Sequence, residues 1–379
     1  MSSSLLNGRF SILFFTKSRF IDAQFCGRCF CWKNFIIATS NRSARSSTST
    51  TLSIDRSMIL SSLQSQHCDY RQSKHFHRSV ATMTAKSNYS IDCRGPINST
   101  DYRIYFREKN NGKIISPWHD IPLFADKAQR IMNMIVEIPR WSNAKMEIST
   151  KEPLSPIKQD VKKGVLRFVH NVFPHKGYIW NYGAFPQTWE NPDHVDQSTN
   201  AKGDNDPIDV LEIGSRVANR GDVLQVKILG TIALIDEGET DWKILSIDIN
   251  DPLANQINDI DDVEKHFPGL LRASVEWFKI YKIPDGKPPN QFAFNGEAKN
   301  KEFAEKIVQE THEFWQEFMR KEGEVSLNRK NTTLNNTESL DENQSNTILE
   351  ERGQKTETLQ PEPLSDPSAI EKWHFVKLI

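Results

Sequence analysis

The order in which β-type and α-type patterns occur along the chain is the strongest constraint on its fold. Runs rich in β-branched and alternating apolar residues cover 165–169, 223–235 and 243–249. Each run is bounded by a glycine or by an Asp-Pro step, which are typical turn signals. The runs are therefore predicted to be strands joined by turns, without interleaved helices.

Helical periodicity comes mainly after these strands. It follows a cluster of aspartates and uses two sets of positions, Phe267, Leu271, Val275 and Phe278, and then Phe303, Ile307, Thr311, Phe314 and Phe318. Both sets are better explained as faces packed on a core than as binding surfaces. Successive strands followed by helices indicate an α+β fold, in which an antiparallel sheet or a small closed barrel has helices packed outside it.

Residues 1–87 are predicted to be a leader that precedes the folded domain. Before Asp101 the chain is rich in arginine and serine, and its only carboxylates are Asp22, Asp55, Asp69 and Asp92. This composition suits an organelle transit peptide, which would make the protein mitochondrial. The alternatives are an unprocessed disordered extension, or translation that starts at Met58 or Met83, and these would leave the protein in the cytoplasm.

The acid-poor stretch contains all five cysteines, Cys26, Cys29, Cys31, Cys68 and Cys93. We therefore expect no disulfide, and no cysteine, in the folded unit. The first three have the spacing of half a zinc site, but a second pair of ligands at a suitable spacing is missing, although His67 is nearby. Incidental thiols are the simpler interpretation.

Residues 322–379 are predicted to be a flexible polar tail. From Glu322 to Ser368 the sequence consists mostly of Asn, Thr, Glu, Ser and Gln, so it cannot bury enough apolar area to offset the entropy lost on ordering. Apolar residues return at the end, including Trp373 and Phe375, and could dock on the domain or on a second subunit. The folded domain is then expected to span 88–321.

Composition limits the partners that this chain can have. The net charge is -1 and 26% of the residues are charged, so no overall field favours nucleic acid. The longest apolar runs, such as 12–15 and 35–38, are far shorter than the about 20 residues of a membrane-spanning helix. We therefore expect a soluble protein without nucleic-acid or membrane partners, whose charged functions are local.

Three acidic segments of the domain provide candidate ligands for divalent cations. They contain Asp204, Asp206 and Asp209, then Asp236 and Asp241, and earlier in the chain Glu137 and Glu147. In the first segment Pro207 fixes a turn that makes the carboxylates converge. That segment alone would be better explained as a solvated turn, but together the segments favour magnesium, which prefers a few carboxylates with waters and substrate oxygens.

A second set of side chains suits a small polyanion. It comprises Lys145, Arg167, Tyr178, Tyr182, Lys243, Tyr281 and Lys282. Arginine offers a fork to phosphate oxygens, lysine a compact charge and tyrosine a neutral donor. Any one of them is better explained as an ion pair or a half-buried hydroxyl, but their combination with the acidic segments indicates phosphoryl chemistry.

Several enzyme classes lack support in the sequence. The chain has no phosphate-binding loop of nucleoside triphosphatases, no His-Glu-x-x-His pair and no serine-hydrolase elbow. A domain expected to lack cysteine also offers no Cys/His pair for nucleophilic catalysis. This favours direct attack by a metal-activated water over a covalent intermediate.

The segments that contain these residues closely resemble the eukaryotic family I soluble inorganic pyrophosphatases. The resemblance is carried by 136–145, 177–189, 203–214, 236–243, 267–273 and 280–288. It extends collinearly from Ser90 to Met319, and the aspartate motif 203–209 is highly specific to that family. The leader and the long polar tail are the main differences from the family pattern.

The resemblance implies a five-stranded barrel of the oligonucleotide-binding (OB) type, a homodimer, and hydrolysis of inorganic diphosphate with three to four Mg²⁺ ions per site. By position, Asp204, Asp209 and Asp241 would hold the first magnesium, and Asp209 would be shared with a second. Asp206 would be the general base for the bridging water, which Tyr178 would support. Asp236, Glu147 and Glu137 would serve the remaining ions, and Lys145, Arg167, Tyr182, Lys243, Tyr281 and Lys282 would hold the phosphates.

Two other functions remain open from the sequence. A non-catalytic scaffold or interaction subunit could retain this fold, although the intact acidic segments argue against it. A broader metal-dependent phosphohydrolase could act on nucleotides or phosphoesters.

Overall fold

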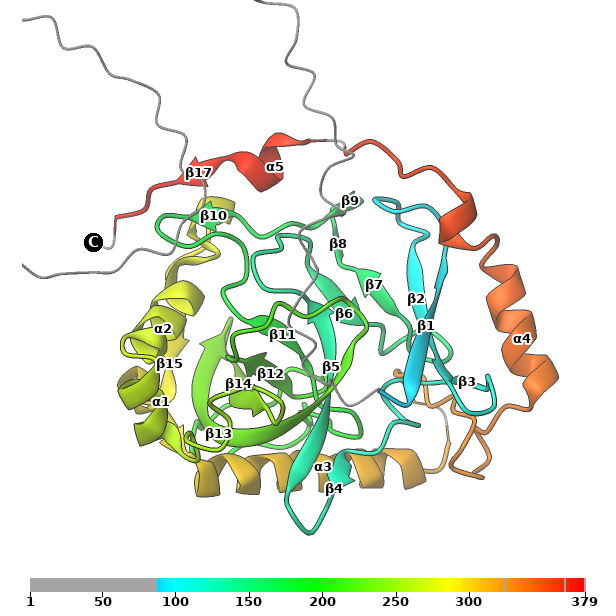
Figure 1. The fold of residues 1–379 in the computed structure, drawn as a ribbon, viewed down its shortest axis with the longest axis horizontal. Coiled ribbons are helices and arrows are strands. Elements are labelled where there is room, and N and C mark those ends of the chain that lie inside the picture. Colours follow the sequence, from blue (N-terminus) through cyan, green and yellow to red (C-terminus); the bar gives the residue numbers. More distant parts are fainter. Residues whose placement is uncertain (1–86, 324, 365, 378–379) are drawn as a thin grey trace, which may run out of the picture. The chain divides into compact units, whose positions relative to one another are not determined.

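The computed structural model describes residues 87–323, 325–364 and 366–377 (Figure 1). The predicted leader, with Cys26, Cys29, Cys31 and Cys68, lies outside these residues. Cys93 does not belong to a leader, because it lies within strand β1 (Tyr89–Arg94) as a half-buried free thiol. The prediction of a folded unit without cysteine was therefore wrong.

The centre of the fold is a closed ring of strands. The ring consists of β5 (Ile131–Ile138), β11 (Asn181–Ala184), β12 (Asp209–Glu212), β14 (Glu239–Asp248) and β13 (Val223–Asp236). Each strand pairs with the next, and β13 pairs back onto β5, which closes the barrel. Only the β12–β14 pair in this ring is parallel. The five-stranded OB-type barrel and the α+β class are thus confirmed.

The long hairpin of β13 and β14 makes the closure possible. β13 has 14 residues, so its first half pairs with β5 while most of its length pairs with β14. At the turn, Glu237 and Gly238 both have positive φ, of 53° and 97°, which matches the right-handed twist of the two strands. Small strands extend the barrel edge, namely β4 (Phe124–Asp126), β15 (Gln291–Phe292) and β16 (Lys299–Asn300).

A second sheet lies beside the barrel. Its order is β1, β2 (Arg103–Glu108), β7 (Ile157–Gln159) and β6 (Met146–Ile148), with β3 (Ile114–Ile115) paired to β2. The remaining short strands are β8 (Val161–Lys162), β9 (Val165–Leu166) and β10 (Asn171–Val172). The predicted strand 165–169 was therefore too long, because β9 ends at Leu166. Phe168 then forms an isolated bridge with Ala144, and Arg167 lines the cleft described below.

The helices pack on the outside of the barrel, as predicted. α1 (Ile260–His266) and α2 (Leu270–Ile280) form a pair at one side, and α3 (Lys301–Arg320) runs along β13 (Figure 1). Pro268 disfavours helical backbone at Phe267, which explains why the periodic stretch that starts at Phe267 is split into two helices. Short 3₁₀ turns cover Ile283–Asp285, Ala293–Gly296 and Thr356–Thr358.

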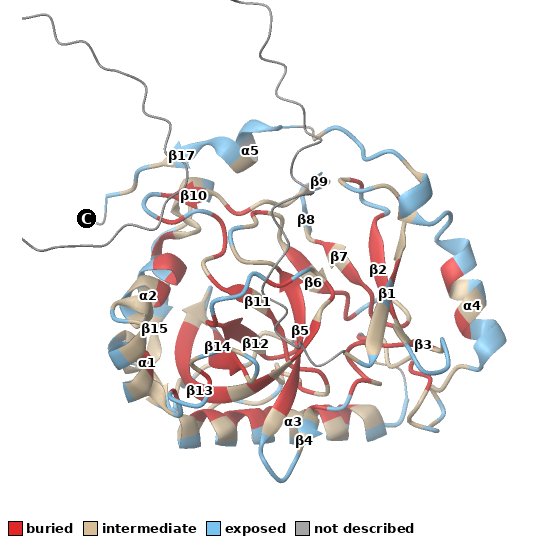
Figure 2. Ribbon diagram, viewed as in Figure 1, coloured by how far each residue is buried: buried red, intermediate tan, exposed pale blue. Residues whose placement is uncertain are grey.

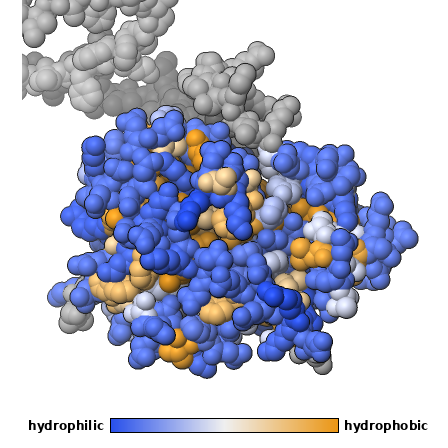
Figure 3. Space-filling model, turned by 90° about the horizontal axis from the view of Figure 1, so that it is seen from below, coloured by the Kyte–Doolittle hydropathy of each residue, from blue (hydrophilic) through white to orange (hydrophobic). Residues whose placement is uncertain are grey.

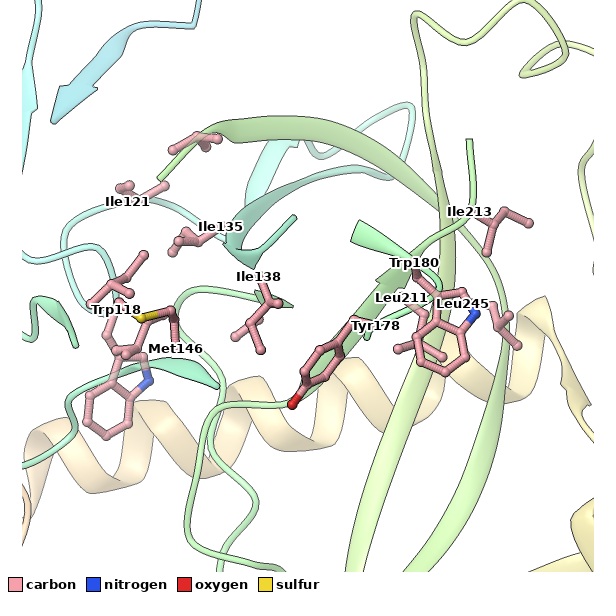
Figure 4. Close-up of a cluster of buried hydrophobic side chains, with 14 of the residues drawn as sticks. Trp118, Ile121, Ile135, Ile138, Met146, Tyr178, Trp180, Leu211, Ile213 and Leu245 are labelled. Carbon is pink, nitrogen blue, oxygen red and sulfur yellow. The ribbon is translucent and has the colours of Figure 1, made fainter. Parts of the chain in front are cut away.

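Apolar side chains fill the barrel and the space under the helices. Figure 2 shows that the buried residues are concentrated in the ring strands and on the inner face of α3. Trp118, Ile138, Trp180 and Leu245 belong to the largest buried cluster, and Figure 4 shows Tyr178 among them. The core therefore reaches the cleft wall directly, and its close packing holds the residues of that wall in place.

The C-terminal region differs from the predicted flexible tail 322–379. It forms α4 (Glu342–Glu351), α5 (Ser368–Glu371) and β17 (Trp373–His374), and it runs across the domain past β3. Leu327, Asn331 and Leu349 are buried. The prediction failed because it considered only apolar area, whereas this segment is held largely by hydrogen bonds of its own polar residues. The apolar end contacts the domain where β17 pairs with β10.

Asp120 is the main polar anchor of this segment. Its carboxylate accepts hydrogen bonds from the backbone N–H groups of Thr332 and Thr333, the latter at 2.8 Å, and from the Thr333 hydroxyl at 2.6 Å. It also accepts one from the backbone N–H of Ser116 at 2.8 Å. One side chain therefore joins the β3–β4 loop to the C-terminal segment.

The surface is largely polar. Figure 3 shows a face on which hydrophilic residues predominate and apolar spots are small and scattered. Among the described residues, no helix combines the length and the apolar character that crossing a bilayer demands.

We predict that Asp120→Ala will loosen residues 325–340 without unfolding the barrel. The substitution leaves several buried N–H groups without an acceptor, which costs about 1–3 kcal/mol for each such group. Hydrogen–deuterium exchange should become faster in this segment and stay slow in β13 and β14. Asp101→Ala, at an exposed position, serves as the control. Unchanged protection of 325–340 in Asp120→Ala would show that the anchor is unimportant.

Candidate active site

Every residue predicted to belong to the site lines one cleft of about 270 Å³ at the side of the barrel. The cleft is lined by Glu137, Lys145, Glu147, Arg167, Tyr178, Tyr182, Asp204, Asp206, Asp209, Asp236, Asp241, Lys243, Tyr281 and Lys282, together with neighbouring apolar side chains. These residues are separated by up to 145 positions in the chain, and the closure of the barrel brings them together.

The strands of the ring explain how the acidic and basic side chains meet. Asp241 and Lys243 are two residues apart on β14, so both side chains point to the same face of the sheet. Asp209 begins β12, and the parallel pairing places it opposite Lys243. Tyr182 comes from β11 on the other side of β12. The one parallel pair of the barrel thus places the centre of the site.

Lys243 is the central cation of the cleft, and it is only 2% exposed. Its ammonium group donates to the carboxylates of both Asp209 and Asp241, and lies 3.2 Å from the Tyr182 hydroxyl oxygen. The Tyr182 hydroxyl in turn donates to Asp209. A buried ammonium group requires such partners, because charge without compensation is costly away from water.

Asp204 and Asp206 lie on a loop rather than on a strand. The backbone N–H of Asp206 donates to the Asp204 carboxylate at 3.0 Å. The Trp189 indole donates to the Asn205 side chain at 3.0 Å, and Asn205 has a positive φ of 74°. The loop therefore has a defined shape that directs its two acidic side chains into the cleft.

The two ends of the cleft carry further pairs of opposite charge. At one end Lys282 lies 2.5 Å and 2.7 Å from the two oxygens of Asp236, and the Tyr281 hydroxyl is 3.4 Å from that carboxylate. At the other end Lys145 lies 2.6 Å from Glu147. These cations are partly paired with acids, and both line the cleft.

Sequence reasoning missed Asp160. Its carboxylate accepts from Arg167 at 3.0 Å and lies 3.5 Å from Lys145, so it orients two of the predicted phosphate-binding side chains. Asp160 follows β7 in a segment of mixed charge, and no motif or spacing marked it.

Sequence reasoning also missed Glu190. One carboxylate oxygen from each of Glu190, Asp204 and Asp241 lies within 4.8 Å of the other two, an arrangement that could hold a metal ion. Glu190 directly follows the segment 177–189 that carries the resemblance. It stands apart from the acidic segments in the sequence, so charge clustering gave no signal.

The crowded carboxylates raise one another's pKa. Burial, and then Asp241, Asp206 and Asp209, hold the pKa of Asp204 well above its usual range. Burial, and then Asp209 and Glu147, do the same for Glu137. Burial also raises the pKa of Asp241 to about 7, although Lys243 opposes the shift and Asp209 adds to it. Divalent cations would remove this repulsion, so the donor set fits a hard cation such as Mg²⁺.

Asp206 is at the rim of the cleft. The residue as a whole is exposed to solvent. Its carboxyl group is nevertheless surrounded by protein atoms, and this desolvation, followed by the charge of Glu147, raises its pKa to about 7. Solvent screens the exposed Asp206, whereas Asp241 is only 6% exposed, so Asp241 dominates the pH dependence of stability. The phenols are neutral donors, since burial also raises the pKa of Tyr178 and Tyr182.

Comparison with known proteins agrees with this geometry. The profile of the family described as inorganic pyrophosphatase matches residues 134–316. An inorganic pyrophosphatase from Drosophila melanogaster is 61% identical over 287 residues, which are 75% of this chain and 83% of that one. One from Debaryomyces hansenii is 56% identical and aligns with 74% of this chain and 96% of its own.

A solved structure also matches. The inorganic pyrophosphatase of Schistosoma japonicum superposes with a TM-score of 0.70 at 49% identity, covering 76% of this chain and all of that one. The barrel and its cleft define an OB-type protein with a cleft lined by many acidic and basic side chains. Within that class, the chain belongs to the inorganic pyrophosphatase family.

We predict that the chelator-treated protein will lose stability as the pH rises. The pKa of Asp241 is about 7 in the folded protein against 3.8 in the reference state, so the folded protein binds this proton more tightly. The stabilisation from this proton is fully present below the unfolded-state pKa of 3.8. It is lost as the pH rises through the folded-state pKa of about 7. The melting temperature should fall between about pH 4 and about pH 7 and level off above that.

Asp241→Asn removes this titration and should flatten the profile in the same interval, whereas Asp101→Asn should leave it unchanged. Differential scanning calorimetry in the presence of a chelator measures the effect. A wild-type profile as flat as that of Asp241→Asn would contradict the predicted shift.

Proposed function

We propose that the cleft hydrolyses inorganic diphosphate to two orthophosphates by direct attack of water, with Mg²⁺ as the cofactor and Asp206 as the general base. The observation that carries this proposal is the meeting of seven predicted carboxylates and seven predicted phosphate-type donors in one cleft. The relatives named inorganic pyrophosphatase support the substrate. The chain therefore acts as a phosphoanhydride hydrolase.

Charge neutralisation is the main physical requirement of this reaction. Diphosphate is strongly anionic, so a nucleophile cannot approach phosphorus until its oxygens are neutralised. Bound magnesium would supply most of that neutralisation and would lower the pKa of a shared water. Three to four ions per site would suit the large number of carboxylates.

The carboxylates divide into three groups in this proposal. Asp204, Asp209 and Asp241 would hold the first ion, and Asp209 would also serve a second. Asp236, Glu147 and Glu137 would serve the ions that accompany the substrate, directly or through water. Asp206 remains as the proton acceptor, and its place at the rim of the cleft supports that role, because a base must reach the attacking water.

The cations and phenols hold the two phosphates. Arg167 offers a planar fork whose orientation is fixed by Asp160 at 3.0 Å. Lys145, Lys243 and Lys282 supply compact charges, while Tyr182 and Tyr281 donate hydrogen bonds without adding charge. Tyr178 supports the water from the core side, since it is 3% exposed and packs against Tyr182 and Trp277.

A panel of substrates tests the proposed function. Protein from Thr84 onward, with Mg²⁺ present, is assayed for phosphate release from diphosphate, from ATP and from a phosphate monoester. We expect strong preference for diphosphate. Comparable rates on ATP or the monoester would favour a broader phosphohydrolase, and no release from any of the three would favour a scaffold that only retains the fold.

We predict that Asp206→Asn will fold normally and lose turnover by roughly 10²–10⁴-fold, the usual contribution of a positioned base. The amide retains the shape and the backbone contacts of the loop but cannot accept the proton. Steady-state kinetics with saturating diphosphate and Mg²⁺ measures the loss. Asp193→Asn changes an exposed acid on a neighbouring loop and should keep full activity. Turnover of Asp206→Asn near the wild-type value would exclude this base.

We also propose that the chain forms a homodimer. Exposed aromatic side chains support self-association, namely Trp141 at 57%, Phe173 at 59%, Trp373 at 40% and Phe375 at 78% exposure. Phe173 packs against Phe375 and Trp373 with ring centroids 5.5 Å and 6.1 Å apart. Sedimentation equilibrium should give a mass twice that of the chain. The Phe173→Asp variant should give a lower mass, because the substitution weakens the association. A wild-type protein that sediments as a monomer at all concentrations would exclude the dimer.

The cellular location depends on residues 1–87. Cleavage of this leader as a transit peptide would make the enzyme mitochondrial, whereas translation from Met83 or an unprocessed leader would make it cytoplasmic. The arginine-rich and acid-poor composition of the leader supports the first of these. The N-terminal sequence of protein isolated from cells separates the two cases.

A further inference from the structure

Glu190 is a buried acid, and only one of its two carboxylate oxygens has a hydrogen-bond partner among the described residues. It is 3% exposed. Its Oε1 atom accepts a hydrogen bond from the backbone N–H of Trp242 at 2.9 Å, but Oε2 is buried and has no hydrogen-bond partner among the described residues. A buried carboxylate oxygen without a partner is costly, so the site requires a further positive group or donor there.

The environment of Glu190 indicates which group that is. Its nearest acidic neighbours are Asp204 and Asp241, and one oxygen from each of the three lies within 4.8 Å of the others. Ligands on opposite sides of a magnesium ion are about 4.2 Å apart, because each Mg–O bond is about 2.1 Å long. Neighbouring ligands of the same ion are about 3 Å apart, so the three oxygens would move closer together when they bind one ion.

The backbone of Glu190 also connects the two segments that carry these aspartates. Its N–H donates to the carbonyl oxygen of Asp206, and its own carbonyl accepts from Asn205, both at 2.9 Å. A Cβ atom at position 203 would come within 2.4 Å of the Glu190 backbone, so Gly203 permits this close approach. With the bond to Trp242, Glu190 joins the Asp204–Asp206 loop to β14.

Burial alone does not explain why the Oε2 atom of Glu190 lacks a hydrogen-bond partner. Glu212 is equally buried, but both of its oxygens have partners: Asn181 donates at 2.7 Å, and the backbone N–H groups of Gly214 and Asp248 donate at 2.7 Å and 3.1 Å. Both oxygens of Glu212, which lies outside the acidic cluster, are thus hydrogen-bonded. Glu190 differs because its second oxygen is unpaired within a group of acids.

We propose that Glu190 is a further member of the metal-binding set, whose charge helps Asp204 and Asp241 to hold a divalent cation from the buried side of the cleft. This inference rests on the proposed metal-dependent function and adds a residue to it. Glu190 also connects the segments of the two aspartates, because its backbone bonds to Asn205 and Asp206 and its Oε1 atom accepts from the Trp242 N–H. Its carboxylate acts on the ion directly or through one water.

Manganese binding tests the proposal without measuring activity. The full chain is titrated with Mn²⁺ in the absence of substrate, and free Mn²⁺ is measured by electron paramagnetic resonance. Glu190→Gln keeps an acceptor for the Trp242 N–H but removes the charge. Its tightest Mn²⁺ site should weaken by about 10–100-fold, the usual effect of losing a group that supports a metal.

Two further variants make the outcome decisive. Glu212→Gln is the matched buried control, and it should lower the melting temperature while leaving Mn²⁺ affinity unchanged. Glu190→Asp keeps the charge on a shorter side chain and should bind Mn²⁺ more tightly than Glu190→Gln, which separates charge from packing.

The outcomes separate the possible failures. Wild-type affinity in Glu190→Gln, or equal weakening in Glu212→Gln, would overturn the role of Glu190 and leave the proposed function intact. A wild-type protein that binds no Mn²⁺ would instead contradict the proposed function itself.

Discussion

Repulsion among buried carboxylates is the physical constraint on which this structure depends. Asp204, Asp209 and Asp241 face one another where little water can screen them, and Lys243 neutralises only part of their charge. Such a group is stable only if protons or cations compensate it. The same excess of negative charge that would destabilise an ordinary core would favour the binding of divalent cations in this cleft.

The barrel provides the rigid frame that keeps these charges together. The β13–β14 hairpin and the closure onto β5 fix the strands, and the parallel β12–β14 pair sets Asp209 opposite Lys243. Because these positions lie on strands packed over a dense core, the carboxylates cannot move apart to relieve their repulsion. Loops complete the site, and Glu190 joins the Asp204–Asp206 loop to β14 through its backbone bonds to the loop and its side-chain bond to the Trp242 N–H.

Much of the fold and site could be predicted because the relevant signals are local in the sequence. Residues 223–249 alternate and turn at Gly238, and the aspartates of 203–209 form a dense motif. The missed features depend on contacts between distant residues. Asp160 and Glu190 are single acids whose roles follow only from where β7, β14 and the aspartate loop meet. The C-terminal segment reads as flexible in the sequence because its order depends on hydrogen bonds to Asp120, which is more than 200 positions away. No local pattern reveals such a contact.

Removal of divalent ions tests the central claim most directly. The purified protein is dialysed against a strong chelator, and phosphate release from diphosphate is then measured while Mg²⁺ is added back. We expect activity to be lost after dialysis and to return with Mg²⁺ in a saturable manner, with the melting temperature rising over the same concentrations. Full activity in the presence of the chelator would contradict a cleft whose carboxylates work by holding cations.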